Sequence, residues 1–478
     1  MALFTALGAL CAFLFIDGKS LSFDEGISVW FAGLRWLDLW NSLHQVDGVQ
    51  APYYVVLHIW TTAFGSSPVA VRSLSGVFSV ATVPAIYLLA RSLVDRKTSL
   101  LASLFCSTSV FVVTYAQIAR PYALESFSSI LSLLAFVYFQ KRPTRLGAFG
   151  YVAISGVAIY LHPFALLMIA AQLVSLPLLT PNWRKQLPIS MIMALTLALL
   201  YTPIAVLQLN DGLSQFDWIP RQEDIVSLGR PLVAFAGSIA LAIVMILCSS
   251  ALFFVVRDRE QRNHLGVLAI WFGFPIGLGW AISFYHPVFV SRYFASAFPP
   301  FVILVASSVR SIRSEIVSGL ATILIVALSI GAVWSGRNAS SQDIRGAASL
   351  VSQNATAHDA VVIFQPAAIF AFQEELEHRG EVLRAPIVYP LVEARSWSQD
   401  LRRIDPSLFP LGHYDHIWLV TIDLDRTHYA ALMAHLAKKY VEESYQQYSN
   451  VAVQRLDARR PASPLPSHLF DGVVPPAE

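Results

Sequence analysis

The sequence predicts an all-α polytopic membrane bundle of about eleven transmembrane helices, with a small C-terminal α/β domain. Three observations lead to this fold class. The chain of 478 residues is 55% hydrophobic and only 13% charged, and its mean hydropathy is +0.57, whereas charged residues make up about a quarter of a soluble domain. Apolar runs of about 20 residues, which is the length that crosses the hydrocarbon, recur along the chain. Beyond residue 336 these runs stop and the share of charged residues rises.

Short polar loops separate the expected spans. An apolar stretch at 51–64 lies between polar flanks and is too short to cross, so we expect a re-entrant or interfacial helix there. The spans are predicted near 2–17, 69–92, 97–115, 121–139, 146–161, 163–180, 187–208, 232–256, 266–285, 294–310 and 315–335.

Positive charge orients the predicted bundle, because cytoplasmic loops carry an excess of Lys and Arg. Alternate loops hold the basic residues, and the loops between them are mainly acidic. The basic set is Arg91, Arg96, Lys97, Lys141, Arg142, Arg145, Arg184, Lys185, Arg257, Arg259, Arg262, Arg310 and Arg313. We therefore expect a cytoplasmic N-terminus and an extracytoplasmic C-terminal domain.

The predicted organisation is a membrane module at 1–336, with its first outer loop at 17–68, and an outer domain at 337–478. Strands alternating with helices predict an α/β fold for this domain. We expect strands at 360–364, 415–422 and within 444–456, helices at 366–379 and 426–440, and a Pro-rich disordered tail at 459–478. All three cysteines fall in predicted spans, so no disulfide is expected in this domain. No Cys/His spacing typical of a metal site occurs.

The pair Asp24 and Glu25 directly follows the first apolar segment. A carboxylate at a membrane boundary is costly to hold near hydrocarbon, so its default interpretation is functional. Further polar residues stand at the same, outer ends of the expected spans. They are His58, Arg72, Arg120, Tyr122, Glu125, His162, His286, Arg292 and Tyr293. Arginines suit an anionic lipid phosphate, and a carboxylate can take a proton from an attacking hydroxyl group.

Simpler interpretations remain open for several of these residues. Arg72 and Arg292 could snorkel to lipid headgroups, and Glu125 could be a structural partner of Arg120. The histidines at 58 and 286 could serve packing, and the base could be Glu25 or neither acid.

Short motifs follow one another in order along the first 310 residues. Phe23, Asp24 and Glu25 precede the run 51–60 (APYYVVLHIW), and 72–76 (RSLSG) comes next. The later motifs are 119–125 (ARPYALE), 160–164 (YLHPF) and 291–294 (SRYF) with Pro299. This ordered set resembles the bacterial protein O-mannosyltransferase-like and aminoarabinose transferase-like membrane enzymes, which are family 39-like glycosyltransferases of the GT-C superfamily.

The resemblance implies a GT-C bundle with its active site on the outer face of a bacterial inner membrane. A hexosyl- or pentosyltransferase would move a monosaccharide from a polyprenyl-phosphate donor to a glycan, lipid or protein acceptor, with inversion. Asp24 would be the catalytic base, with Glu25 beside it. The residues expected to bind donor phosphate or substrate are Arg72, Arg120, Tyr122, Glu125, His162, Arg292 and Tyr293, and the interfacial helix would contribute Tyr53, Tyr54 and His58.

Two matters stay open at this point. The family often has His-Pro-Pro where this chain has Gln50, Ala51 and Pro52, which leaves the sugar and acceptor undecided. Some GT-C enzymes need a divalent cation and others do not; Asp24 and Glu25 could bind one, but no second acidic cluster is evident.

Two other classes of function were weighed against the enzyme. A transporter or lipid flippase would need ionisable residues near the bilayer midplane and broken helices or repeats. A non-catalytic scaffold would not require charged residues gathered on one face. The sequence favours the enzyme, and nothing in it points to nucleic acid.

Overall fold

The computed structural model describes residues 1–43, 50–210, 219, 224–336, 342–365, 368–388, 411, 414–422, 430, 433–434, 436–437 and 439–457. The chain forms two compact units. The first, which we call the membrane unit, comprises 1–16, 48–56 and 72–337. The second, the outer unit, comprises 17–47, 57–71 and 338–478. Segments of the expected first loop are thus grouped with the C-terminal part.

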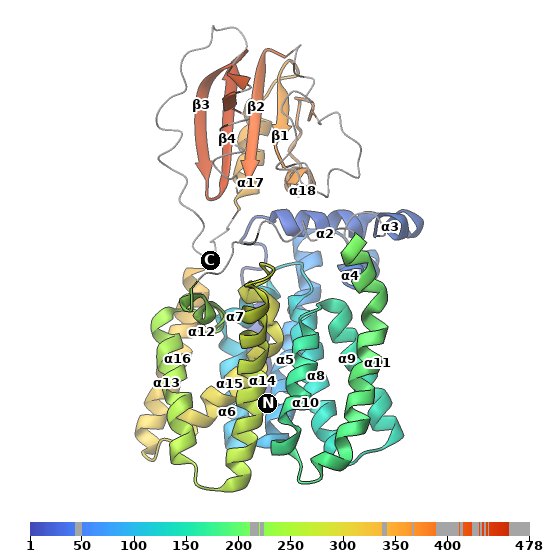
Figure 1. Cartoon of the computed structure of the whole chain (residues 1–478). Coiled ribbons are helices and arrows are strands. Elements are labelled where there is room, and N and C mark those ends of the chain that lie inside the picture. Colours follow the sequence, from blue (N-terminus) through green and yellow to red (C-terminus); the bar gives the residue numbers. More distant parts are fainter. Residues whose placement is uncertain are drawn as a thin grey trace. The chain divides into compact units, whose positions relative to one another are not determined.

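The membrane unit is a bundle of helices (Figure 1). Its helices are α1 (Ala2–Phe13), α5 (Pro68–Leu93), α6 (Arg96–Thr108), α7 (Val110–Ala116), α8 (Tyr122–Lys141), α9 (Arg145–Leu161), α10 (Ala165–Leu179), α11 (Trp183–Asn210), η3 (Val226–Gly229), α12 (Arg230–Ala236), α13 (Ile239–Val255), α14 (Arg259–Ile282), η4 (Ser291–Ala297), α15 (Phe298–Arg310) and α16 (Glu315–Ser335). Helix α4 (Ala51–Phe64) begins in this unit, at the position expected for the short interfacial helix.

Each expected span has a helical counterpart in the structure. Six helices are long and apolar enough to cross a membrane, and two bent pairs pass the same test when each pair is taken as one span. The remaining three expected spans correspond to the shorter apolar helices α1, α9 and α10. The helical membrane bundle is therefore confirmed. The basic ends of α5 and α8 lie side by side, since Lys141 Nζ donates to the carbonyl oxygen of Ser92 at 2.7 Å.

The two bends occur where the backbone leaves the helical conformation. Ser109 is extended between α6 and α7, which meet at 50°. Gly237 has φ +84° between α12 and α13, which meet at 97°. This left-handed conformation suits glycine, and a Cβ there would lie 2.9 Å from Val110 Cγ2.

Hydrogen bonds between side chains fasten the middle of the bundle. Gln172 on α10 accepts from the Tyr151 hydroxyl group at 2.5 Å and donates to Ser132 Oγ at 3.2 Å. Ser132 on α8 in turn lies 2.7 Å from Ser155 Oγ on α9. Because such polar atoms have no water in the bilayer core, these contacts hold three helices in register.

The outer unit contains a four-stranded sheet with the order β1-β2-β4-β3. Strands β1 and β2 are parallel and the other pairs are antiparallel. Its elements are α2 (Phe23–Gly33), α3 (Trp36–Leu43), α17 (Ile344–Asn354), β1 (Ala360–Ile363), α18 (Ala368–Arg379), β2 (His416–Ile422), β3 (Val441–Tyr448) and β4 (Val451–Asp457). Helices α17 and α18 share one core with one sheet face, in which Ile344, Phe372 and Val420 are buried.

The small α/β domain is confirmed, with one correction. The third strand expected within 444–456 is in fact a hairpin of β3 and β4, because Ser449 (φ +51°) and Asn450 form a tight turn. Helix α17 was not expected. The helix expected at 426–440 and the tail at 459–478 lie almost wholly outside the described residues.

Helix α2 packs closely on α18. A Cβ built on Gly26 would lie 2.4 Å from the backbone nitrogen of Ala371, so only glycine fits here without a shift. One turn further on, the Trp30 and Phe370 rings stack with centroids 4.7 Å apart. The α2 part of the first outer loop is therefore built into the same unit as the C-terminal residues.

We predict that Gly26→Ala lowers the thermal unfolding midpoint of the full-length protein, because the new methyl group would push α2 away from α18. Overpacking of this kind costs about 1–3 kcal/mol. The matched control is Gly33→Ala, since nothing lies within 4 Å of a Cβ at that end of α2. Thermal unfolding is monitored by tryptophan fluorescence. Equal unfolding midpoints for the two variants would contradict the close packing of α2 on α18.

Candidate functional site

In the membrane unit, the expected donor-binding residues come from helix ends at one side of the bundle. Arg120 lies in the turn just before α8, which begins with Tyr122. His162 directly follows α9, and Arg292 and Tyr293 lie in η4. Pro121 at the α8 N-cap ends the preceding segment and fixes where this helix starts.

Aromatic contacts bring three of these residues together. The His162 ring centroid lies 4.7 Å from that of Tyr293 and 6.1 Å from that of Tyr122. His162 Nδ1 accepts a hydrogen bond from the Phe164 backbone at 3.3 Å, which fixes the ring plane. The motifs at 120–122, 160–164 and 291–294 thus meet in space.

Two guanidinium groups flank this cluster. Arg120 is buried, and one of its terminal nitrogens donates to the Tyr54 hydroxyl group at 3.3 Å. The Arg292 guanidinium lies 5.7 Å from the Tyr293 ring centroid. Both arginines interact electrostatically with His162. Two positive groups beside one imidazole make a region suited to an anion.

Glu125 lies one turn into α8 and is completely buried. Its Oε1 accepts from Ser129 Oγ at 3.5 Å, and the backbone N–H of Ser296 also donates to the carboxyl group. Oε2 has no hydrogen-bond partner among the described residues. Since buried polar atoms almost always have one, this oxygen is suited to accept from a bound molecule.

Arg72 and Tyr53 are both buried within the membrane unit. Arg72 is 1% exposed and donates to the carbonyl oxygen of Ile16 at 2.9 Å, so it lies inside the protein rather than reaching a lipid surface. Tyr53 is also buried, with its ring 6.0 Å from that of Tyr54.

In the outer unit, Glu25 and Asp24 have different environments. Glu25 Oε2 accepts from the Ser22 backbone N–H at 3.0 Å, and Ser22 Oγ accepts from the Glu25 N–H at 3.3 Å. This reciprocal capping box starts α2 and leaves Glu25 only 2% exposed. Asp24 lies in the same first turn and is half-buried. Glu25 is therefore committed to the helix start.

The two histidines named from the sequence take different positions. His58 is buried, and its Nδ1 lies 2.9 Å from the carbonyl oxygen of Ala32. Its ring centroid lies 4.3 Å from that of Trp36, with the two ring planes at 67°. These contacts match the packing interpretation. His286 is exposed.

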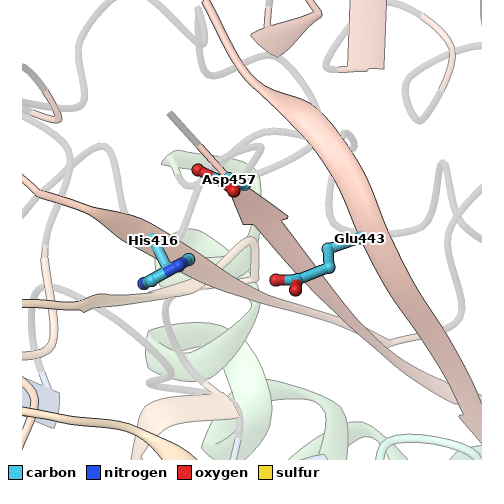
Figure 2. Close-up of side chains that lie close together, drawn as sticks. All are labelled: His416, Glu443 and Asp457. Atoms are coloured by element: carbon cyan, nitrogen blue, oxygen red, sulfur yellow. The ribbon is translucent and has the colours of Figure 1, made fainter. Parts of the chain in front are cut away.

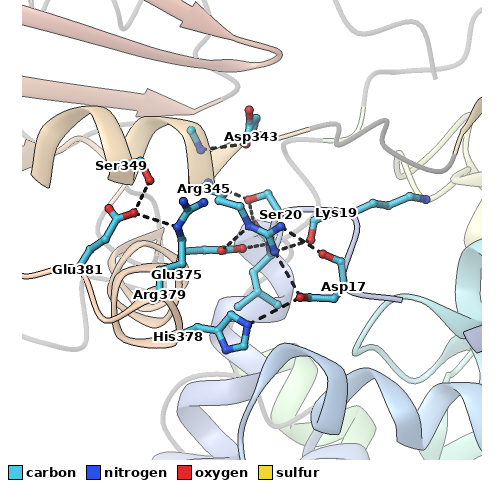
Figure 3. Close-up of polar contacts among 12 residues, drawn as sticks. Asp17, Lys19, Ser20, Asp343, Arg345, Ser349, Glu375, His378, Arg379 and Glu381 are labelled. Carbon is cyan, nitrogen blue, oxygen red and sulfur yellow. Dashed lines mark hydrogen bonds and ion pairs between the residues drawn. The ribbon is translucent and has the colours of Figure 1, made fainter. Parts of the chain in front are cut away.

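A buried ion pair holds the segment that precedes α2, and no motif pointed to it (Figure 3). Glu375 on α18 is 0% exposed; its Oε1 accepts from the Leu21 N–H at 2.6 Å, and its Oε2 accepts from Arg345 Nε at 2.8 Å. Arg345 also donates to the carbonyl oxygens of Asp17 at 3.2 Å and Lys19 at 3.1 Å. The backbone leading to Asp24 is thus tied to two C-terminal helices.

Comparisons with known proteins agree with this architecture. Residues 52–207 match the family described as dolichyl-phosphate-mannose-protein mannosyltransferase. The crystal structure of ArnT from Cupriavidus metallidurans in the apo state matches with a TM-score of 0.55 and 13% identity, over 95% of this chain and 97% of that one. ArnT bound to undecaprenyl phosphate matches with the same TM-score and identity, over 97% of this chain and 99% of that one. No curated protein matches the sequence.

The family match is confined to residues 52–207, and the ArnT structures show a shared fold; both findings agree with the resemblance noted from the motifs. With the helical spans, they also support a multi-pass membrane protein. The roles of the individual residues remain predictions.

We predict that Arg345→Ala lowers the thermal unfolding midpoint strongly, because it leaves the buried Glu375 carboxylate without its charged partner. Breaking a buried pair costs about 3–5 kcal/mol. The control is Arg35→Ala, whose pair with Asp38 is largely exposed and is screened by water, so its loss should change the midpoint little. The double variant Arg345→Met with Glu375→Gln should recover much of the loss; a midpoint as low as that of Arg345→Ala would contradict a charge-based cause.

Proposed function

We propose that this protein is an integral-membrane glycosyltransferase that moves a monosaccharide from a polyprenyl-phosphate donor to an extracytoplasmic acceptor. The family match over 52–207 and the fold shared with ArnT support this function. One ArnT structure holds undecaprenyl phosphate, which is the kind of molecule that such a transfer would release. We further propose a bacterial inner-membrane location with a cytoplasmic N-terminus.

The observation that carries the proposal is the pair of arginines around His162. Guanidinium groups bind phosphate oxygens through paired, charge-assisted hydrogen bonds, and they keep their charge at any physiological pH. Tyr54 already holds Arg120 in place, and Tyr293 supports Arg292. We propose that these arginines bind the donor phosphate, with Tyr122, His162 and Tyr293 beside it.

The proposed reaction is a single displacement at the sugar carbon. A carboxylate base takes the proton of an acceptor hydroxyl group, the hydroxyl oxygen forms a bond to C1, and the bond between C1 and the phosphate oxygen breaks. Polyprenyl phosphate leaves with the electron pair of that bond, and the arginines stabilise its growing negative charge. Attack opposite the leaving group inverts the configuration at C1.

We propose Asp24 as the base. Glu25 is held by Ser22 as a helix cap, whereas Asp24 is the half-buried acid of the same turn. Arg345 and Glu375 then act as positioning residues, since they fasten the segment before α2. Glu125, with one carboxyl oxygen unpartnered in the described structure, would accept a hydrogen bond from the sugar.

We predict that Asp24→Asn reduces sugar transfer by about 10²–10⁴-fold, because the amide cannot accept the hydroxyl proton. The assay uses purified protein with a panel of polyprenyl-phosphate sugars and follows donor consumption. Asp38→Asn, at an exposed pair on α3, is the control and should keep full activity. Wild-type turnover by Asp24→Asn would remove this residue from the mechanism.

We predict that Arg120→Ala weakens use of the donor more than use of the acceptor, because it removes a phosphate-binding charge. The measurement is KM for each substrate, with kcat. Tyr54→Phe removes only the hydroxyl group that accepts from Arg120, so a smaller change in the same direction is expected. An equal loss towards both substrates would indicate that Arg120 is structural.

A further inference from the structure

A row of ionisable side chains crosses all four strands at one end of the outer-unit sheet. His416 opens β2 and lies directly opposite Asp457, the last residue of β4. Asp359 immediately precedes β1, at the level of His416 in the parallel pairing. Glu443 lies at the irregularity of β3 between Glu442 and Ser444. An extra residue at such a bulge is re-aimed relative to its neighbours.

Three of these side chains converge, as Figure 2 shows. One ligand atom from each of His416, Glu443 and Asp457 lies within 4.8 Å of the other two. Imidazole and carboxylate groups are ligands that Zn²⁺ takes in proteins. A tetrahedral ion with bonds of about 2.0–2.2 Å needs ligand atoms about 3.3–3.6 Å apart, so a shift of about 1 Å closes the site. Glu443 is exposed and is the group best able to move.

Asp359 orients the imidazole from the other side. It is 1% exposed and lies with Oδ1 2.9 Å from His416 Nδ1. Its Oδ2 accepts from the Thr356 backbone at 2.9 Å and from Trp418 Nε1 at 3.3 Å.

The hydrogen bonds of Asp359 have a consequence for the histidine. Because Oδ2 already accepts from Thr356 and Trp418, Oδ1 is the oxygen left to accept from His416 Nδ1–H, and the lone pair of the neutral ring is then on Nε2. Histidines that bind metals are commonly held in this way, by a carboxylate on the nitrogen that does not bind the ion. Such a partner selects the tautomer and raises the basicity of the ligand.

The charges around the ring also favour a cation. Three carboxylates, those of Asp359, Glu443 and Asp457, surround one imidazole. Arg455 offsets part of this charge, since its Nε lies 3.3 Å from Glu443 Oε2 while its guanidinium lies over the Trp418 ring. Arg455 would have to release Glu443 when an ion binds, which the exposure of Glu443 allows.

We propose that His416, Glu443 and Asp457 form a binding site for a divalent transition-metal ion of the Zn²⁺ type, with Asp359 as the positioning residue of the histidine. Three protein ligands leave a fourth position for water or another donor. The site belongs to the outer unit alone, and it does not depend on the proposed glycosyl transfer.

The test uses the full-length protein, purified in detergent without a histidine tag and stripped of metal. Zn²⁺ is titrated in by calorimetry, and bound zinc is counted after dialysis. We expect about one more zinc per chain in the wild type than in His416→Ala. Asp457→Asn should weaken binding at least tenfold, and Asp359→Asn, which keeps all three ligands, about 10–100-fold.

His378→Ala is the matched control, because it removes another histidine of the outer unit that lies near a carboxylate, that of Asp17. It should bind zinc as the wild type does, and circular dichroism should show every variant folded. Equal zinc binding by the wild type and His416→Ala would overturn the proposal and leave the cluster as a histidine paired with acidic residues. Loss of binding in His378→Ala alone would place the zinc elsewhere and overturn it as well.

Discussion

The outer unit depends on one buried carboxylate. Glu375 is fully enclosed on α18, and it accepts hydrogen bonds from the Leu21 backbone and from Arg345 on α17. An isolated charge in such a place would be strongly unfavourable, so the three groups hold together or separate together. Because the Leu21 amide belongs to the segment that starts α2, a single interaction fixes the N-terminal loop against two helices from the far end of the chain.

Chemistry in the membrane explains why much of this fold could be predicted. A membrane span must be long, apolar and bounded by polar loops, so the spans that end near Lys141 and Arg310 can be recognised from the sequence alone. The sequence signals for the strands and helices of the outer unit are weaker than those for membrane spans. The turn at Ser449 and Asn450 lacks glycine, and this made one strand seem to continue where a hairpin forms. Helix α17 is only partly apolar and becomes recognisable through the core that it shares with Phe372.

The candidate site residues were named from their chemistry at the ends of the expected spans and from the family resemblance. The motifs containing Arg120, His162 and Arg292 come together in the membrane unit, while their roles stay predictions. The capping role of Glu25 was not predicted, although serine followed three residues later by glutamate is the signature of a capping box. The row of His416 and Asp457 was not visible, since it exists only through the strand register. No sequence motif marks Glu375 either, because its structural role comes from its burial in the folded protein.

The distance along the chain between Leu21 and Glu375 has a consequence for synthesis. These residues are 354 positions apart, and ribosomes add about 5–20 residues per second. The amide therefore waits about 18–70 s before its acceptor has been made. Throughout that interval the surface of α2 around Gly26 and Trp30 stays uncovered. A chain truncated after the last span would lack α18 and would leave this surface of α2 without the partner that covers it.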